Sequence, residues 1–337
     1  MISVICPIYN EEKYIERCVE SVLRQDYPQE ELEILFVDGL STDRTRELLR
    51  PYLERYSFIH LLDNPERIVP YAMNRGIRAA RGEVVIRLDA HAIYPANYFS
   101  VLVSRLNELH ADNVGAVCRT LPAHNTWKCR AIAFALSCPF GMGNAHFRIG
   151  ADKIMLVDTV PFGCFPKWIF DKVGLYDVDL VRNQDDELNA RIIKHGGKIY
   201  LLPELIVDYY ARDTIKKTGT MFYQYGLYKP LVNCKLGAPA TVRQFIPVGF
   251  VLGIIGCGIL GIFWPVLYIV LGALLCCYII IAVTVGVREL YEQQTDWRQV
   301  FILPVIFFVV HWSYGWGYLQ GILKLLFHRS FNVQANH

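Results

Sequence analysis

The sequence carries little net charge, no pair of cysteines spaced C-x-x-C, and no basic leader followed by an apolar segment. Its 34 lysine and arginine residues nearly balance 32 acidic residues, and the formal charge of +2 excludes the extended basic surface of a nucleic-acid-binding protein. The ten cysteines lie in apolar runs, so we expect reduced, buried thiols in a cytosolic globular part. The opening MISVICP does not have the composition of a secretory signal.

Apolar residues are abundant, and they are unevenly distributed. They make up 53% of the 337 residues, which is a high share for a soluble protein. The apolar excess follows Arg243, whereas most of the charge lies in the first 240 residues. The composition therefore predicts a globular part in water, followed by a part in a membrane.

The first 90 residues alternate short β-rich runs with helical patterns. Strands are expected at residues 2–8, 33–37, 59–62 and 82–88, and helices at 14–23, 45–56 and 69–80. A further helix is expected at 97–109 and a strand at 114–117, whereas residues 122–166 have no clear periodicity. This alternation predicts an α/β fold with a doubly wound, mostly parallel sheet.

Acidic residues stand where the strands of this expected sheet end. Asp38 and Asp89 each close a strand, and Asn10 and Glu11 lie in a third loop at the same edge. Ligands of such sheets bind outside the carboxyl ends of the strands, and a buried carboxylate needs a cationic partner or a metal. The pattern favours a ligand site. The alternative is that each carboxylate only caps the helix that follows it.

Three motifs, in this order, resemble the signatures of the family 2 glycosyltransferases. They are PIYNE at residues 7–11, VDGLSTDRT at 37–45, and AMNRG with AARG between 72 and 82. The resemblance covers residues 1–230 and implies a GT-A fold, a single domain that binds a nucleotide-diphospho-sugar. It places the following residues around the base and ribose of the donor, which we expect to be a UDP-sugar: Pro7, Tyr9, Glu11 and Asp38.

The run DAH at residues 89–91 stands where the family has its Asp-x-Asp metal motif. A departing nucleoside diphosphate needs a divalent cation to neutralise its developing charge. Asp89 and His91 are therefore the expected ligands of Mn²⁺ or Mg²⁺, and the imidazole favours Mn²⁺. The alternative is that His91 only hydrogen-bonds a phosphate or the loop.

A second acidic run, QDDELNAR at residues 184–191, resembles the family's segment that carries the catalytic base. The resemblance aligns Asp185 with the base, and Asp186 is the second candidate. Chemistry requires such a base, because an acceptor hydroxyl loses its proton as it attacks the anomeric carbon opposite the departing diphosphate. The alternative is a solvated helix N-terminus favoured by the helix dipole, above all for Glu187.

Two later segments resemble the succinoglycan-type transferases, which extend lipid-linked saccharides. They contain Arg212, whose planar fork would clamp the pyrophosphate, and Gln224, which would reach the sugar or diphosphate. Arg212 has the alternative of a surface pair with Asp213 or Asp208. The Q-x-x-R-W signature of processive synthases is absent from the sequence, which favours addition of one sugar at a time.

Two uncharged apolar runs, at 245–263 and 266–285, are each long enough to cross a bilayer. The expected parts are a GT-A domain (1–230), a juxtamembrane linker (231–244), a transmembrane hairpin (245–286), a cytoplasmic loop (287–299) and a third apolar helix (300–327). The third helix is transmembrane, re-entrant or interfacial. Basic residues on both sides of the hairpin place the globular domain at the cytoplasmic face.

These features predict an integral-membrane, inverting, non-processive glycosyltransferase of exopolysaccharide or cell-surface glycan biosynthesis. Its partners would be a nucleotide-sugar donor, a lipid-linked saccharide acceptor and membrane lipids. The rival within the fold is a polyprenyl-phosphate sugar transferase, whose lipid phosphate acceptor needs no strong base. A transporter is disfavoured because the apolar runs contain no carboxylate, and a nucleotide-binding regulator would bind the donor without catalysis.

Overall fold

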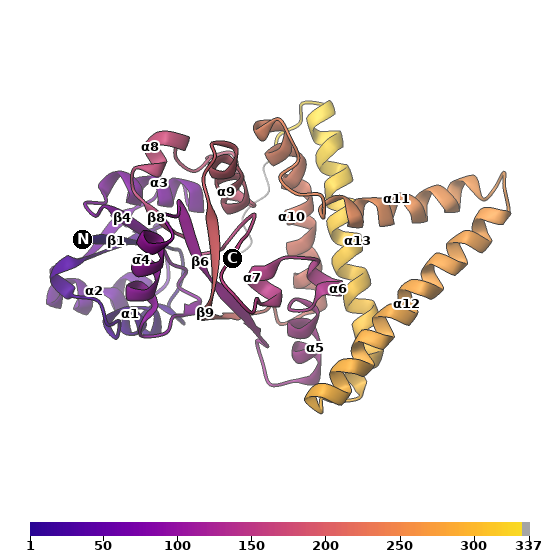
Figure 1. Cartoon of the computed structure of the whole chain (residues 1–337), viewed down its shortest axis with the longest axis horizontal. Helices are drawn as coiled ribbons and strands as arrows, with labels where there is room; N and C mark the ends of the chain where they lie inside the picture. Colours follow the sequence, from indigo (N-terminus) through magenta and orange to yellow (C-terminus); the bar gives the residue numbers. More distant parts are fainter. Residues whose placement is uncertain (332–337) are drawn as a thin grey trace. The chain divides into compact units, whose positions relative to one another are not determined.

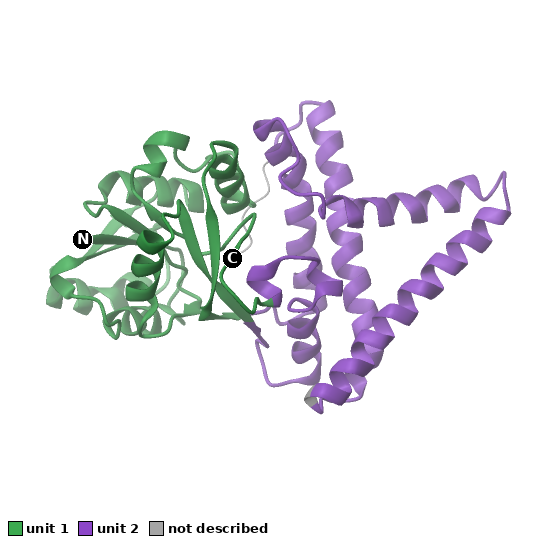
Figure 2. Cartoon of the chain, viewed as in Figure 1, with its two compact units in different colours: residues 1–119, 150–209, 333–337 green, residues 120–149, 210–332 purple. Residues whose placement is uncertain are grey.

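The computed structural model describes residues 1–331 and divides them into two compact units. Unit 1 contains residues 1–119 and 150–209, and unit 2 contains residues 120–149 and 210–331 (Figure 2). Residues 120–149 therefore belong with the C-terminal helices, although in the sequence they lie between two stretches of unit 1.

Within residues 1–331, one nine-stranded sheet runs in the order β3-β2-β1-β4-β8-β6-β9-β5, and β7 pairs with β9 (Figure 1). The strands are β1 (Ile2–Ile8), β2 (Leu32–Asp38), β3 (Ile59–Asp63), β4 (Val84–Arg87), β5 (Ala92–Ile93), β6 (Asn113–Leu121), β7 (Met155–Leu156), β8 (Cys164–Pro166) and β9 (Ile199–Tyr210). The pairs β3-β2, β2-β1 and β1-β4 are parallel, as the sequence predicts. The short β8 then pairs antiparallel with β4.

The helices of unit 1 cover both faces of the parallel strands. They are α1 (Ile15–Leu23), α2 (Thr45–Arg55), α3 (Val69–Ala79), α4 (Tyr98–Glu108), α8 (Ile169–Val173) and α9 (Gln184–Lys194), with a 3₁₀ turn at Gln29–Glu31. Successive side chains of a strand point to opposite faces, so Val4 joins the core under α1 while Ile5 faces α3. A Cβ atom at Gly76 of α3 would lie 2.5 Å from Ile5, which explains the glycine of the AMNRG motif. The predicted α/β architecture is confirmed.

Unit 2 is helical. Its helices are α5 (Trp127–Ala135), α6 (Pro139–Met142), α7 (His146–Ile149), α10 (Ile215–Leu236), α11 (Phe245–Leu260), α12 (Val266–Gln293) and α13 (Arg298–Leu326). By length and composition, the segments Val266–Glu292 and Arg298–Leu326 could each cross a membrane, and α11 is a shorter apolar helix. The fold therefore joins an α/β domain to C-terminal helices suited to a membrane.

Helices α10 and α13 approach each other closely at glycines of both helices. A Cβ atom at Gly317 would lie 2.2 Å from the carbonyl oxygen of Tyr223, and one at Gly226 would lie 2.0 Å from that of Tyr314. Further along, a Cβ atom at Gly321 would lie 2.3 Å from the carbonyl oxygen of Leu227. These positions require glycine because backbone atoms fill the space that a side chain would need.

The substitution Gly317→Ala tests this contact. We expect it to destabilise unit 2 by about 1–3 kcal/mol, because the added methyl group forces the two helices apart. The matched control is Gly272→Ala on α12, where an added Cβ atom meets no other atom within 4 Å. Thermal unfolding of the detergent-solubilised protein gives the comparison, and equal melting temperatures for the two variants would contradict the tight packing.

Candidate active site

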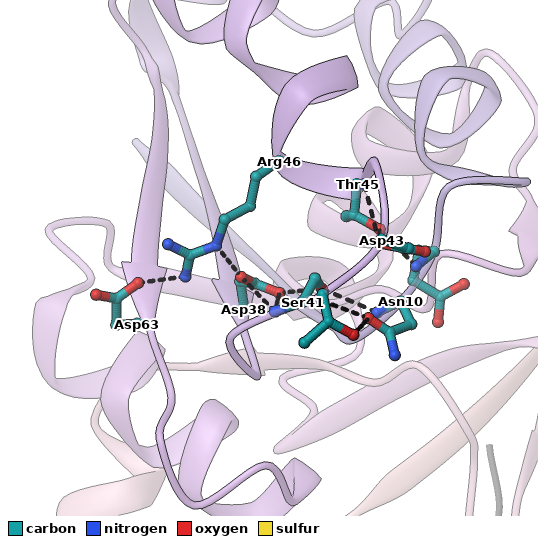
Figure 3. A network of polar contacts seen from close by, with 9 residues as sticks. Asn10, Asp38, Ser41, Asp43, Thr45, Arg46 and Asp63 are labelled. Carbon is teal, nitrogen blue, oxygen red and sulfur yellow. Dashed lines mark hydrogen bonds and ion pairs between the residues drawn. The ribbon is translucent and has the colours of Figure 1, made fainter.

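The loops that follow β1 and β2 are held together by hydrogen bonds. The backbone N–H of Asn10 donates to the Ser41 hydroxyl at 2.8 Å, and the Asn10 side-chain oxygen accepts from the N–H of Thr42 at 2.8 Å (Figure 3). The N–H of Glu11 donates to the Thr45 hydroxyl at 2.6 Å. The two motifs PIYNE and VDGLSTDRT therefore form one structural element, although the residues that these hydrogen bonds join are 31 or more positions apart in the chain.

Asp38 is 0% exposed at the end of β2, and its carboxylate has several donors. It accepts from the N–H of Ser41 at 3.1 Å, from the Ser41 hydroxyl at 2.5 Å, and from the Arg46 guanidinium (Figure 3). Arg46 also pairs with Asp63 at 2.5 Å, at the end of β3. Asp38 thus organises the loop between β2 and α2, a structural role similar to the helix-capping alternative. That Asp38 contacts the sugar-nucleotide donor stays a prediction.

Tyr9 lies where the loops after β1, β2 and β3 meet. A Cβ atom at Gly39 would be 2.9 Å from the Tyr9 ring, and the Arg67 guanidinium is 5.7 Å from the centre of that ring. Pro7 pairs in register with Val37. An aromatic face flanked by a cation is suited to stacking a nucleotide base.

His91 bridges two carboxylates. Its Nδ1 atom is 2.9 Å from an oxygen of Asp89, and its Nε2 atom is 3.0 Å from an oxygen of Glu11. Burial lowers the pKa of His91, but the hydrogen bonds to Asp89 and Glu11 outweigh it and raise the pKa to about 10. Burial raises the pKa of Asp89, whereas the hydrogen bonds from His91 bring it down to about 2. His91 is therefore held between two acidic side chains whose hydrogen bonds favour its protonated form.

The donor set of this cluster suits a divalent cation. Two carboxylates and an imidazole are oxygen and nitrogen ligands of the kind that Mn²⁺ accepts. Within residues 1–331, however, no group of three or more such side chains is already placed to hold a metal. If a cation binds at this cluster, Asp89 with Glu11 or His91 would hold it.

Asp185, in the first turn of α9, forms an ion pair with Arg87 of β4. The Arg87 side chain is 8% exposed and that of Asp185 is 29% exposed, so the pair is buried at the arginine and open to solvent at the carboxylate. Burial raises the pKa of Asp185, and Arg87 opposes that rise. Arg87 and Asp89 are two residues apart, so they lie on the same side of the chain at the end of β4. The two predicted acidic sites are thus connected through one strand.

Helix α9 is anchored behind Asp185. Glu187 is buried and accepts from Arg191 at 2.6 Å, and Arg191 also donates to the carbonyl oxygens of Val173 and Leu175. The interpretation of Glu187 as a solvated helix N-terminus is therefore wrong, because its side chain is buried and pairs with Arg191, which in turn holds the neighbouring loop. Asn189 adds a buried hydrogen bond of 2.7 Å to Asn113 of β6.

The remaining predicted donor ligands, Arg212 and Gln224, belong to unit 2, whereas the residues above belong to unit 1. Gln224 is buried in α10. The two aspartates considered as surface partners of Arg212 each pair with a different basic residue. Asp208 pairs with Arg119 at 2.6 Å, and Asp213 pairs with Lys217 at 2.9 Å. Asp186 follows Asp185 in the first turn of α9.

Three arginines of this site were not identified from the sequence: Arg46, Arg67 and Arg87. Arg87 had a usable signal, because a charged residue in an otherwise apolar, buried strand needs a buried partner. Arg46 and Arg67 lie in polar stretches, where nothing separates a functional arginine from a solvated one.

Known proteins resemble this chain along most of its length. The model of glycosyl transferase family 2 matches residues 3–177. The "Dolichyl N-acetyl-alpha-D-glucosaminyl phosphate 3-beta-D-2,3-diacetamido-2,3-dideoxy-beta-D-glucuronosyltransferase" of Methanococcus voltae is 28% identical over 332 residues, which cover 96% of this chain and 97% of that protein. The succinoglycan biosynthesis protein ExoA of Rhizobium meliloti is 29% identical, with coverage of 73% and 74%.

A solved structure also resembles this chain. It is the mannosyltransferase PcManGT of Pyrobaculum calidifontis in complex with GDP-Man and Mn²⁺, with a TM-score of 0.58. The match covers 94% of this chain and 87% of that one at 18% sequence identity, which shows a shared fold.

The substitution Arg46→Met tests the buried charge at Asp38. We expect it to lower the free energy of unfolding by about 1–3 kcal/mol, because Asp38 loses its cationic partner while it remains buried. Arg44→Met is the matched control, since Arg44 pairs with Glu47 on the exposed surface of the same helix start. Denaturant unfolding followed by tryptophan fluorescence measures both, and an equal effect of the two substitutions would contradict the role of Arg46.

Proposed function

The chain belongs to glycosyl transferase family 2 and has a GT-A domain followed by C-terminal membrane-type helices, and from this premise we propose its reaction. It transfers one sugar at a time, with inversion, from a nucleotide-diphospho-sugar to a hydroxyl group of a lipid-linked saccharide. The donor is a UDP-sugar, and the product enters exopolysaccharide or cell-surface glycan biosynthesis.

The observation that carries this proposal is the Arg87–Asp185 pair beside Asp89. A glycosyl transfer needs a base on one side of the anomeric carbon and charge neutralisation on the other. Asp185 is a partly exposed carboxylate held in place by Arg87, and Asp89 lies two residues beyond Arg87. The base would thus come from the start of α9 and the charge neutralisation from the end of β4, and the Arg87–Asp185 ion pair joins these two elements.

In the proposed mechanism, Asp185 accepts the proton of the acceptor hydroxyl while the hydroxyl oxygen attacks the anomeric carbon. The bond from that carbon to the diphosphate oxygen breaks on the opposite face, so the configuration inverts. Burial raises the pKa of Asp185, which makes it a stronger proton acceptor, and the Arg87 guanidinium opposes that rise and positions the carboxylate. Asp186 is the second candidate for this role.

Donor binding is proposed for the loops after β1, β2 and β4. Tyr9 and Arg67 would stack the base, with Pro7 and Asp38 shaping the pocket, and Arg212 and Gln224 would contact the diphosphate and sugar. A bound divalent cation, Mn²⁺ or Mg²⁺, supplies charge neutralisation for the departing diphosphate, and Asp89 with Glu11 or His91 would hold it. The complex of the Pyrobaculum mannosyltransferase with GDP-Man and Mn²⁺ supports this proposal by its similar fold.

A lipid-linked acceptor is supported by two relatives and by the helices of unit 2. The name of the Methanococcus relative includes a dolichyl N-acetylglucosaminyl phosphate, and the Rhizobium relative is a succinoglycan biosynthesis protein. Apolar helices α11 and α12 would hold the enzyme at the membrane that contains such an acceptor. We propose that the catalytic domain lies on the cytoplasmic side, where its buried thiols, Cys6, Cys18, Cys118 and Cys164, would stay reduced.

Calorimetric titration of UDP and GDP into the detergent-solubilised protein tests the donor class. We expect UDP to bind in the presence of Mn²⁺, with at least roughly tenfold weaker binding after chelation or in Asp89→Ala, because the diphosphate loses its counter-charge. Asp171→Ala, at an exposed carboxylate of α8, is the matched control and should bind like the wild type. If neither nucleotide binds to the wild type, the transferase proposal is contradicted. If GDP binds more tightly than UDP, the donor is a GDP-sugar and not a UDP-sugar.

The substitution Asp185→Asn tests the base. We expect transfer to fall by roughly 10²–10⁴-fold while UDP binding persists, because the acceptor hydroxyl can no longer be deprotonated. In the wild type, kcat/KM should fall as the pH drops through the raised pKa of Asp185, because the protonated carboxyl cannot accept a proton. The loss of activity should therefore begin at a pH above the usual pKa range of an aspartate. Activity is measured with radiolabelled sugar nucleotide and a membrane lipid extract.

Two comparisons make the test of the base decisive. If Asp186→Asn abolishes transfer and Asp185→Asn does not, the assignment of the base is reversed. If neither substitution reduces transfer, the acceptor is a lipid phosphate, which attacks without a strong base. Asp171→Asn should leave transfer unchanged.

A further inference from the structure

Helix α13 exposes one apolar stripe along its whole length. The stripe contains Phe301, Val305, Phe308, Trp316, Leu323 and Leu326, which are spaced three, four or seven to eight residues apart on one helix face. Trp312 belongs to the same face, because its ring stacks between those of Phe308 and Trp316. We call this face the α13 stripe.

The other faces of α13 are covered by protein within unit 2. Leu303, Ile306 and Phe307 are 0% exposed and pack in one core with residues of α5. The glycines of α13 face α10, as described above. The stripe is therefore the face of α13 that unit 2 leaves open.

A bilayer crossing by α13 conflicts with the charges of α10. The two helices run in the same direction, because Tyr223 meets Gly317 and the later Leu227 meets the later Gly321. At Gly219 of α10, a Cβ atom would lie 3.2 Å from the hydroxyl of Ser313, next to the midpoint of Arg298–Leu326.

Lys216 and Lys217 lie within about one turn of Gly219, and Lys217 pairs with Asp213 at 2.9 Å. If α13 crossed the membrane, these charged groups would lie near the centre of the hydrocarbon layer, where charge is strongly disfavoured.

The α11–α12 hairpin packs on α13 near both ends of its base, and between them the Tyr278 hydroxyl of α12 lies 2.8 Å from Nδ1 of His311. Gly286 of α12 packs against Val300 and Leu303, and Pro247 of α11 packs against Gly315. These points are roughly 18 Å apart along the helix axis, at 1.5 Å per residue. The far ends of α11 and α12 are joined by a short turn, so α13 runs across the base of the hairpin (Figure 2).

We propose that only the α11–α12 hairpin crosses the bilayer, and that α13 lies along the membrane–water interface with its stripe at the headgroup–acyl boundary. A hairpin that crosses the bilayer places the helix at its base along the membrane surface. The aromatic content agrees, since tryptophan favours interfacial depth and Trp312 and Trp316 occupy the middle of α13 rather than its ends. The ring of Phe250 on α11 lies 6.0 Å from that of Phe308 in the stripe, so the apolar hairpin adjoins the stripe and the same phospholipid bilayer would cover both.

Depth-dependent quenching of Trp312 tests this placement. The full chain keeps Trp312 while its other five tryptophans become phenylalanine, and it is reconstituted in phosphatidylcholine vesicles brominated either near the headgroup or near the chain end. We expect the ratio of shallow to deep quenching to exceed one. The control has Leu274→Trp as its only tryptophan, at an exposed position near the middle of the stretch of α12 between the hairpin tip and Gly286, and its ratio should be below one.

A ratio below one for Trp312 would overturn the proposal, because it places the middle of α13 at the bilayer centre. Absence of quenching at both depths, with the control quenched normally, would also overturn it and would indicate that protein, such as a second copy of this chain, covers the stripe.

A second measurement uses the otherwise unchanged chain and decides the question if the single-tryptophan variant does not fold. Epitope tags are added before Met1 and after His337, and protease is added to sealed vesicles of known orientation. An interfacial α13 leaves both tags on the same side of the membrane, so both are cleaved together. Cleavage of only one tag would show that α13 spans the membrane. Neither measurement depends on transferase activity, so failure here is distinct from failure of the proposed reaction.

Discussion

Glu11 and Asp38 are buried and Asp89 and Asp185 are partly buried, and the structure depends on giving each of these acidic side chains a basic partner. Arg46 pairs with Asp38, His91 bridges Asp89 and Glu11, and Arg87 pairs with Asp185. A buried charge without a partner is strongly destabilising, so these cations are a condition for placing acidic groups at the strand ends. The arrangement also means that the acidic groups are positioned before any donor binds, which reduces the reorganisation that the reaction requires.

Unit 2 meets a different constraint, because one of its surfaces is suited to lipid and another carries charge. Helix α10 has lysines on its surface, and α13, which packs against it at backbone distance, has an open apolar stripe. Glycines at the contact allow two helices of such different composition to behave as one element. The α11–α12 hairpin then projects from this pair as the most apolar part of the chain. An enzyme that holds a lipid-linked acceptor needs both surfaces, because the sugar of the acceptor is in water while its lipid is in the membrane.

Much of the parallel half of the sheet could be predicted from local pattern. Apolar runs ending in Asp38 and Asp89 predicted β2 and β4, and the family suggested by the motifs is confirmed by the match to residues 3–177. The antiparallel β8 was not predicted, because its three residues lie in a region without periodicity. Glu187 was interpreted wrongly for a related reason: an acidic first turn is typical of a solvated helix start, and only its contact with Arg191 shows that it is buried.

The sequence by itself determined which segments are apolar enough for a membrane and which motifs end the strands, because both depend on residues that are close together in the chain. Tertiary structure alone decided which charges become partners. Arg87 and Asp185 are 98 residues apart, and the partner of α13 is a helix that begins more than 80 residues earlier. Periodicity carries no information about such distant pairs. They are set only when the order of strands in the sheet and the packing of helices bring particular side chains within contact distance.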